Sequence, residues 1–360
     1  MSRARRSRVL IISAPRDLHA RKVGAHLVEA GVRPDLFDIR HFPSRARVVM
    51  ARGDASRTAL LLPDGTRVDE AELLSVWWRR PQRPRVAPEV TDAAHRRFAL
   101  NESYCALNGL WQSLRARWVN PVLADSAASH KPYQLEVAPT VGLTVPETVI
   151  TNDPDAAREL VDAHDGRVIY KALAGLPDAW RETRLLRREE AALLDAVRYA
   201  PVIFQEVIDG TDLRVTLVGD DIFAAEMDTT RARYAYDIRM DMTVPVRAVK
   251  LDATTEASLR GLMRALGLEY GAVDMKRRPD GSLVFLEINP AGQFLHIEEL
   301  TGMPIARALA ARLMHKEAPD AKEARQEEAA VEDASRGPGA VDAARGARRA
   351  RRRGRASAST

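Results

Sequence analysis

The sequence predicts an α/β fold with several domains, and three observations support this prediction. With 360 residues, the chain is longer than one ordinary hydrophobic core requires, so two or three domains are expected. Residues 8 to about 125 alternate strand-like and helix-like segments. From about residue 205 onward, glycine-containing turns separate pairs of strand-like runs, which is typical of antiparallel hairpins.

Composition narrows the class of protein. Hydrophobic residues make up 46% of the chain, enough for a sizeable core, and the single cysteine, Cys105, excludes an intrachain disulfide. One cysteine fits the reducing cytoplasm, which is therefore the expected location. The apolar run "VLII" behind the basic N-terminus is shorter than the roughly 7–15 residues of a signal-peptide core, and no stretch approaches the roughly 18 apolar residues of a membrane span. We therefore interpret "VLII" as a first β-strand and expect no membrane partner.

The positive charge is concentrated near the end of the chain. Seven arginines lie between Arg345 and Arg355 with no acid among them, and they exceed the formal net charge of +5. The rest of the chain is therefore slightly acidic, so no basic nucleic-acid-binding face is expected on the folded body. The tail could contact RNA or an acidic surface. However, residues 317–360 are low in complexity, and a disordered Ala- and Arg-rich extension is the expected structure.

Residues 1–125 are expected to form one α/β domain. A strand "RVLIISA" precedes a helix that ends at Gly31, a hairpin turns at Asp64 and Gly65, and the strand "SVWWRRP" ends at a proline. A long amphipathic helix then runs from Asp92 to about Arg117 and is ended by "WVNP". The strand "SVWWRRP" should bury its two tryptophans on alternate faces. Arg79 or Arg80 can pair with acids of the next domain, and the alternative is that they contact the substrate directly.

Residues 126–204 are expected to form a central subdomain and residues 205–316 a C-terminal one. The first begins with a helix "KPYQLEVAPTVG" capped by Ser129, followed by an extended segment, a helix and the strand "GRVIYKAL". The second contains an apolar strand, a hairpin around Gly219, a helix "TTEASLRGLMRALG", a second hairpin and a last helix "TGMPIARALAARLM".

The second hairpin, "GAVDMKRRPDGSLVFLEINP", carries polar side chains where apolar ones would be expected. Glu287 and Asn289 lie two residues apart on a strand, so they point to the same face of the sheet. A turn at Asp280 and Gly281 places Asp274 directly across from Glu287. A set of two carboxylates and one amide oxygen suits Mg²⁺, which usually keeps several waters and binds nucleotide phosphates. These positions therefore predict a magnesium site for a nucleotide.

At this point the chain resembles the ATP-grasp superfamily over nearly all of residues 8 to 315. The acidic hairpin matches the metal-binding triad of that superfamily, and Lys131 and Lys171 match its two nucleotide-contacting lysines. The resemblance implies an ATP-grasp fold in which a central and a C-terminal domain sandwich ATP behind a Rossmann-like pre-ATP-grasp domain. It also implies that Glu287 bridges two Mg²⁺ ions. "FQEVIDGTDLRV" resembles the adenine-binding hinge, in which backbone groups of Glu206 and Ile208 contact the base; the expected pocket residues are Gln205, Glu206, Val207, Ile208 and, for the ribose, Asp212.

Within the superfamily, "SVWWRRP", "RWVNP" and "NPAGQFLHIEELTGMPI" most resemble the graspetide (microviridin-type) macrocycle ligases. Ribosomal-protein glutamate ligases are similar and share the metal hairpin. The resemblance implies an ADP-forming ligase that activates Asp or Glu side chains of a precursor peptide as acyl-phosphates and joins them to Ser, Thr or Lys side chains. A leader segment of that peptide would be a binding partner, and a second copy of the chain, forming a homodimer, is the other partner considered. The alternatives are a ligase that adds amino acids to a carboxylate and a peptide-docking module without turnover.

Two Asp-x-Arg patterns complete the expected site. Asp212 with Arg214, and Asp237 with Arg239, each lie on one face of an extended segment. An arginine fork can hold both an acyl-phosphate and a carboxylate, and the resemblance places such pairs near the γ-phosphate and the acceptor. The other interpretation is a same-strand ion pair, and Asp212 could instead bind the ribose.

His296 follows the metal strand in "GQFLHIEE". It could be a base that deprotonates the attacking hydroxyl, although the sequence favours a helix-packing histidine.

Overall fold

The computed structural model describes residues 7–53, 56–174, 182–229 and 244–315. The chain divides into two units, Met1–Met314 and His315–Thr360, and the fold described below is that of the first. The second unit contains the predicted tail, 317–360, which lies outside the described residues. Among the described residues, no helix is both long and apolar enough to cross a membrane.

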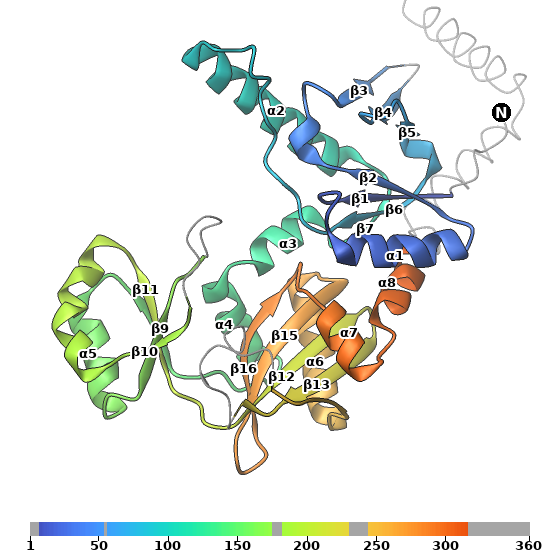
Figure 1. Cartoon of the computed structure of the whole chain (residues 1–360). Coiled ribbons are helices and arrows are strands. Elements are labelled where there is room, and N and C mark those ends of the chain that lie inside the picture. The colour runs from blue at the N-terminus through green and yellow to red at the C-terminus, as the bar shows by residue number, and fades with distance from the viewer. Residues whose placement is uncertain (1–6, 54–55, 175–181, 230–243, 316–360) are drawn as a thin grey trace, which may run out of the picture. The chain divides into compact units, whose positions relative to one another are not determined.

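The N-terminal segment forms a parallel sheet with helices on both faces, in the order β2-β1-β6-β7. Side chains on alternate faces of β1 pack against α1 on one side and α2 on the other, which is the arrangement expected for a Rossmann-like domain (Figure 1). The elements are β1 (Arg8–Ile12), α1 (Leu18–Glu29), β2 (Arg33–Phe37), η1 (Ile39–His41), β6 (Leu73–Trp78), α2 (Ala93–Ser113) and β7 (Arg117–Val119).

A small antiparallel sheet, β3-β4-β5, is inserted between β2 and β6. Its strands are β3 (Arg47–Ala51), β4 (Arg57–Leu61) and β5 (Arg67–Asp69), followed by the short helix η2 (Glu70–Glu72). Gly65 has a φ of 86° in the turn between β4 and β5, which confirms the hairpin predicted at Asp64 and Gly65.

The two tryptophans of β6 face opposite sides of the sheet, as predicted. Trp77 is fully buried against α1 and α8. Trp78 packs on the other face with Trp111 and Trp118, at ring-centroid distances of 5.7 and 6.2 Å. This strand therefore contributes to two hydrophobic clusters at once.

A second, smaller sheet has the order β10-β9-β11-β8 and is antiparallel throughout. Helix α5 and the 3₁₀ segment η3 bury apolar side chains against it. The elements are β8 (Thr148–Thr151), α5 (Pro154–Ala163), β9 (Val168–Lys171), β10 (Arg184–Leu185), η3 (Arg188–Tyr199) and β11 (Val202–Glu206).

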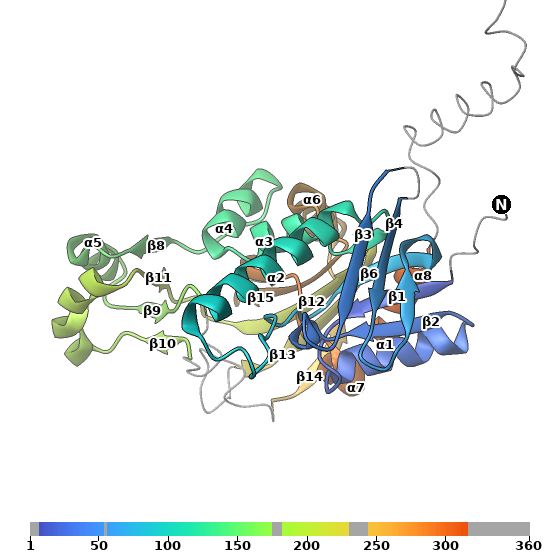
Figure 2. The ribbon, with the colours of Figure 1, turned by 90° about the horizontal axis from the view of Figure 1, so that it is seen from above.

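The largest sheet is antiparallel and has the order β14-β13-β12-β15-β16. One of its faces is covered by three helices, α3, α4 and α6, which Figure 2 shows gathered together. Its strands are β12 (Thr211–Val218), β13 (Asp221–Met227), β14 (Val246–Val249), β15 (Tyr270–Arg277) and β16 (Leu283–Asn289), and the covering helices are α3 (Val122–Ala128), α4 (Lys131–Thr140) and α6 (Ala253–Leu266).

Helix α4, which lies in the segment predicted to begin the central subdomain, thus packs on the largest sheet together with α3, which begins before that segment. The predicted cap of α4 is wrong. His130 occupies the N-cap position without a side-chain hydrogen bond, while Ser129 ends α3 and donates its hydroxyl hydrogen to the Asp125 carbonyl. A new helix begins two residues later, so Ser129 serves the preceding helix.

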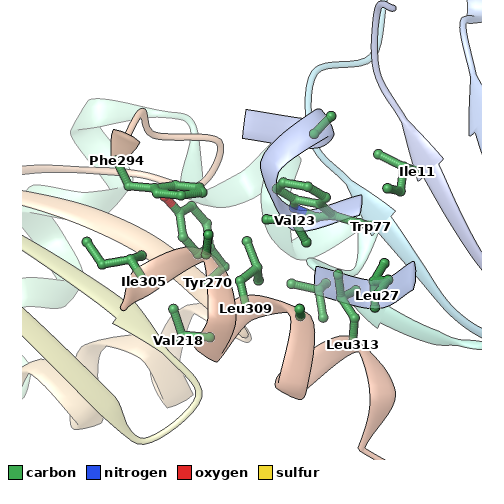
Figure 3. Packing of buried hydrophobic residues seen from close by; sticks show 14 of the residues in the cluster. Ile11, Val23, Leu27, Trp77, Val218, Tyr270, Phe294, Ile305, Leu309 and Leu313 are labelled. Carbon is green, nitrogen blue, oxygen red and sulfur yellow. The ribbon is translucent and has the colours of Figure 1, made fainter. Parts of the chain in front are cut away.

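On the other face of the largest sheet, apolar side chains occupy only one half. Helices α7 (Leu295–Thr301) and α8 (Ile305–Met314) pack on this half, and α8 also packs against α1 (Figure 1). Figure 3 shows Leu309 and Leu313 of α8 between the large sheet and the side chains of α1. The N-terminal sheet and the largest sheet therefore share one hydrophobic core.

Candidate active site

The second half of that sheet face carries charged side chains in place of apolar ones. Along β12, Leu213 and Val215 point into the core beneath α6, whereas Asp212 and Arg214 point to the opposite face. The neighbouring strands continue the pattern, because the residues paired with these two are Lys276 and Asp274. Each carboxylate on β12 and β15 thus lies directly across from a positively charged side chain on the neighbouring strand.

The hairpin of β15 and β16, called the metal hairpin below because it carries the three predicted metal ligands, has the predicted pairing across its strands. Asp274 is the cross-strand partner of Glu287. The register shifts by one residue between Asp274 and Met275, since Met275 pairs with Phe285 and leaves Leu286 as the extra residue of a bulge. The turn also begins earlier than a simple two-residue turn at Asp280–Gly281, because the Arg278 N–H donates to the Ser282 carbonyl. The bulge compensates for this offset and returns Glu287 to its place opposite Asp274.

The three predicted metal ligands lie together. The Asn289 amide nitrogen is 3.2 Å from Asp274 Oδ2 and 3.1 Å from Glu287 Oε1. Among the described residues no three His, Cys, Asp or Glu side chains form a ligand cluster, so the site depends on the amide as its third member. Two carboxylates and an amide within hydrogen-bond reach of one another form an oxygen donor set that suits Mg²⁺ and leaves room for phosphate oxygens.

Helix α4 carries two side chains to this hairpin from positions three residues apart. Lys131 forms an ion pair with Glu287. Gln134 accepts a hydrogen bond from the Ile288 N–H at 2.9 Å and donates to the Ile288 carbonyl at 2.8 Å. Because Gln134 is buried and binds the backbone between Glu287 and Asn289, it fixes the strand that presents them. Gln134 was not predicted from the sequence, although its position three residues after Lys131 places both side chains on one face of the helix.

Lys171 ends β9 and donates to the Gln205 side-chain carbonyl at 3.1 Å. Gln205 is buried and is held in turn by its own donation to Thr148 Oγ1 at 2.8 Å. Burial and the nearby positive charge of Lys131 lower the pKa of Lys171 to about 7, and Asp274 partly opposes this shift. Two lysines that destabilise each other's charge form a site that would be stabilised by an anion such as a phosphate chain.

The predicted hinge follows β11 and is anchored on its outer side. The Glu206 N–H donates to the Glu147 carbonyl at 3.0 Å, and the Glu206 carboxylate accepts from the Glu147 N–H at 3.0 Å. The Val207 N–H donates to the Arg167 carbonyl at 3.1 Å. Within the described part of the chain, the Ile208 N–H has no acceptor, so it is the hinge donor that could contact a purine edge.

The first Asp-x-Arg pair lies on one face of β12, but its members do not bind each other. Arg214 donates to Asp274 Oδ1 at 2.6 Å and to the Gln293 carbonyl at 3.2 Å. Asp212 forms an ion pair of 2.7 Å with Lys276 and accepts from the Thr229 hydroxyl. The same-strand ion pair considered as the alternative is therefore wrong for this pair. The second pair, Asp237 and Arg239, lies outside the described residues.

Lys276 is a second residue that the sequence argument missed. It lies two residues after Asp274, and hence on the same face, which was a usable signal. Burial raises the pKa of Asp212, while the Lys276 charge, its hydrogen bond and the Thr229 hydrogen bond lower it. Because its carboxylate is already engaged by Lys276 and Thr229, Asp212 is a weaker candidate for ribose binding than the sequence implied.

Two buried residues of the N-terminal segment hold the loop after the metal strand. Arg79 donates to the Ala291 carbonyl at 2.6 Å and the Gly292 carbonyl at 2.8 Å. Its ion-pair partner is Asp17 of the same domain, at 3.1 Å, so Arg79 is not the arginine of this strand that pairs with an acid of the next domain. Asn120 donates to the Pro290 carbonyl at 3.1 Å. Through these hydrogen bonds, the motifs "WWRRP" and "WVNP" hold the loop that follows β16.

Comparison with known proteins agrees with this arrangement. Residues 8–126 match the family model of the MvdD pre-ATP grasp domain. The macrocyclase MdnC from Microcystis aeruginosa MRC, solved with its precursor peptide MdnA, is 29% identical, with a TM-score of 0.77 over 85% of this chain and 99% of MdnC. The chain is an ATP-grasp ligase.

Two further relatives resemble this ATP-grasp ligase. The RiPP-associated ATP-grasp ligase of Chryseobacterium gregarium, solved with ADP, a leader and a core peptide, is 25% identical, with a TM-score of 0.79 over 87% of this chain and 98% of that ligase. The ribosomal protein bS6–L-glutamate ligase of Escherichia fergusonii is 25% identical over 233 residues, which cover 62% of this chain and 72% of the relative. The ATP-grasp fold predicted from the sequence is therefore confirmed.

Proposed function

We propose that this ligase macrocyclises a ribosomally made precursor peptide. It would activate Asp or Glu side-chain carboxylates with ATP and join them to Ser or Thr hydroxyls or to Lys amines. The observation that carries the proposal is the similarity to MdnC, which includes the N-terminal domain and spans nearly all of that macrocyclase. The complexes of MdnC and of the Chryseobacterium gregarium ligase contain precursor, leader or core peptides, which supports a peptide substrate here.

The charged sheet face supports the chemistry of carboxylate activation. A carboxylate is a poor electrophile, and phosphorylation converts one of its oxygens into a good leaving group. Phosphoryl transfer chiefly requires alignment and charge neutralisation. Asp274, Glu287 and Asn289 would hold Mg²⁺, and we infer two ions. When bound, Mg²⁺ would neutralise phosphate charge and polarise the P–O bond.

The chain's own cations would perform the rest of the alignment. Lys131 and Lys171 would hold phosphate oxygens as point charges, and the Ile208 N–H would contact the adenine. The mutual repulsion of the two lysines and the absence of an acceptor for the Ile208 N–H within the described part of the chain support these roles. Arg214 presents a planar fork beside Asp274, where it would hold the acyl-phosphate and the substrate carboxylate in one orientation. The side chains of Lys131, Lys171 and Arg214 come from α4, β9 and β12, which are packed elements of the fold, and this favours a defined geometry.

A second candidate is a ligase that adds free amino acids to a protein carboxylate. The similarity to the bS6–L-glutamate ligase favours it, because that relative matches 233 residues of this chain. The two functions share the activated carboxylate and differ only in the nucleophile. They therefore predict opposite changes in the mass of the substrate.

Mass spectrometry separates the two functions. The ligase, ATP and Mg²⁺ are incubated with a candidate precursor peptide, which carries a leader segment and a core rich in Ser, Thr, Asp and Glu, with and without free glutamate. We expect ADP and a peptide lighter by about 18 Da for each bond formed, because each ring closure removes one water. The same peptide without its leader should react far more slowly, since remote contacts supply alignment. A peptide that instead gains glutamate residues would establish the second function.

The pKa of Lys171 predicts a pH dependence of nucleotide binding. Phosphate oxygens favour the charged lysine, so above a pKa of about 7 each bound nucleotide should take up a proton. The affinity for ADP should then fall by up to about tenfold per pH unit between about pH 7 and pH 9. Calorimetry in buffers of different ionisation enthalpy measures this uptake. Lys171→Met should abolish it, whereas the exposed Lys22→Met should not; wild-type binding without proton uptake at pH 8.5 would show that Lys171 does not contact the phosphates.

A further inference from the structure

The first turn of α7 carries His296, which lies within electrostatic reach of Arg214 on the charged sheet face. The loop before it is anchored on both sides: the Gly292 carbonyl accepts from the Tyr270 hydroxyl at 2.9 Å, and the Gln293 carbonyl accepts from Arg214 at 3.2 Å. Gly292 must be glycine here, because an added Cβ would lie 2.3 Å from the Ala272 Cβ. The backbone that carries His296 is therefore fixed relative to the arginine fork.

His296 is less buried than its neighbours on the same segment. Phe294 and Ile297 are fully buried in the shared core, whereas His296 is only half-buried. Among the described residues, neither ring nitrogen of His296 has a hydrogen-bond or ion-pair partner. His19 provides the contrast: it is buried, packs edge-on against Phe294 at 4.6 Å, and lies 3.5 Å from the Phe294 N–H. The helix-packing role that the sequence favoured for His296 is filled by His19.

The surroundings keep the imidazole of His296 neutral. Burial lowers the pKa of His296, and the Arg214 charge lowers it further, while Asp274 and Glu299 act in the opposite direction. His19 also lies within electrostatic reach of His296. A neutral imidazole has one ring nitrogen able to accept a proton.

The carboxylates near Arg214 are already engaged. Asp274 is bonded to Arg214, Glu287 to Lys131, and Asp212 to Lys276 and Thr229. Asp274 and Glu287 are also the oxygen donors suited to Mg²⁺. Within the described part of this face, His296 is thus the titratable group with an uncommitted acceptor beside the arginine fork.

We propose that His296 is the base that accepts the proton of the attacking Ser or Thr hydroxyl. The inference rests on the proposed macrocycle ligase function. In this step the hydroxyl oxygen forms a bond to the acyl carbon, the bond from that carbon to the phosphate oxygen breaks, inorganic phosphate leaves, and the hydroxyl proton passes to a ring nitrogen of His296, which later releases it to solvent. A lysine amine needs this base too when it is protonated, but an added neutral nucleophile does not.

Hydroxylamine separates activation of the carboxylate from attack by the hydroxyl. It reacts with an acyl-phosphate without a protein base and gives a peptide hydroxamate. The substrate is the same candidate precursor peptide, with a leader and a core rich in Ser, Thr, Asp and Glu, supplied with ATP and Mg²⁺. His296→Gln should keep hydroxamate formation near the wild-type rate and lose ester formation by about 100-fold or more. The matched control is the exposed His95→Gln on α2, which should retain both.

The pH dependence adds a measurement that a merely structural role would not change. Wild-type ester formation should rise with pH to a plateau as His296 loses its proton, and His296→Gln should lack this limb while melting at the wild-type temperature. Ester formation by His296→Gln at the wild-type rate, or an equal loss of ester and hydroxamate, would overturn the assignment. If the wild type forms neither ester nor hydroxamate, the proposed function itself fails; if it forms hydroxamate and His296→Gln still makes esters, only the role of His296 fails.

Discussion

Replacing Glu287 with glutamine is expected to reduce ligation by at least about 100-fold, because groups that merely support a metal ligand already contribute about 10–100-fold. Glutamine keeps the volume of the side chain and removes the charge that would hold Mg²⁺ and that pairs with Lys131. The fold should persist, since β16 is held by its ladder with β15 and by the two hydrogen bonds of Gln134 to Ile288. The loss should therefore appear in turnover and not in the melting temperature.

The measurement is the rate of product formation across a range of Mg²⁺ concentrations, with the melting temperature recorded beside it. The exposed Glu159→Gln on α5 is a matched control that removes one carboxylate outside the charged sheet face and should retain activity. Unchanged product formation by Glu287→Gln at ordinary Mg²⁺ concentration would contradict the assignment of the metal hairpin. A large fall in its melting temperature would show that the side chain is structural.

Replacing Arg214 with alanine is expected to remove ligation more completely than nucleotide binding. Loss of one group that stabilises developing charge typically lowers turnover by about 10²–10³-fold. The nucleotide should still bind, because the hinge donor Ile208 follows β11 and the two lysines lie on α4 and β9, so none of them is on β12. Arg214→Lys keeps the charge without the planar fork, so it should recover little of the activity.

Both variants are compared with Arg307→Ala, an exposed arginine on α8. Turnover is followed by mass spectrometry and ADP affinity by calorimetry. An equal loss of both in Arg214→Ala would place this side chain at the nucleotide instead of at the acyl-phosphate. Normal cyclisation by Arg214→Lys would show that a point charge suffices there.

Local periodicity was enough to predict the metal hairpin. Alternation along "VFLEIN" places Glu287 and Asn289 on one face, and the glycine turn brings Asp274 opposite them, as the structure confirms. The bulge at Leu286 was not predictable, because it compensates for a longer turn whose geometry depends on packing. The correct pairing therefore results from two irregularities that cancel.

The partners of the charged residues were the part that the sequence could not specify. Arg79 and Asp17 lie on different elements of the same domain, and Asp212 meets Lys276 only because β12 and β15 are neighbours. Such pairings depend on sheet order and on which face each strand presents, and neither is contained in a local pattern. For the same reason, the contrast between the buried His19 and the uncommitted His296 became visible only in three dimensions.

The proposed function requires that this sheet face activate a peptide side-chain carboxylate by phosphorylation and then close a ring. A precursor peptide whose Asp and Glu side chains carry ¹⁸O in both carboxylate oxygens tests both steps in one experiment. For each bond formed, one ¹⁸O should appear in the released phosphate and the peptide should become lighter by about 20 Da, the mass of one labelled water. Unlabelled phosphate would contradict activation of the carboxylate, and labelled phosphate with a heavier peptide would contradict ring closure.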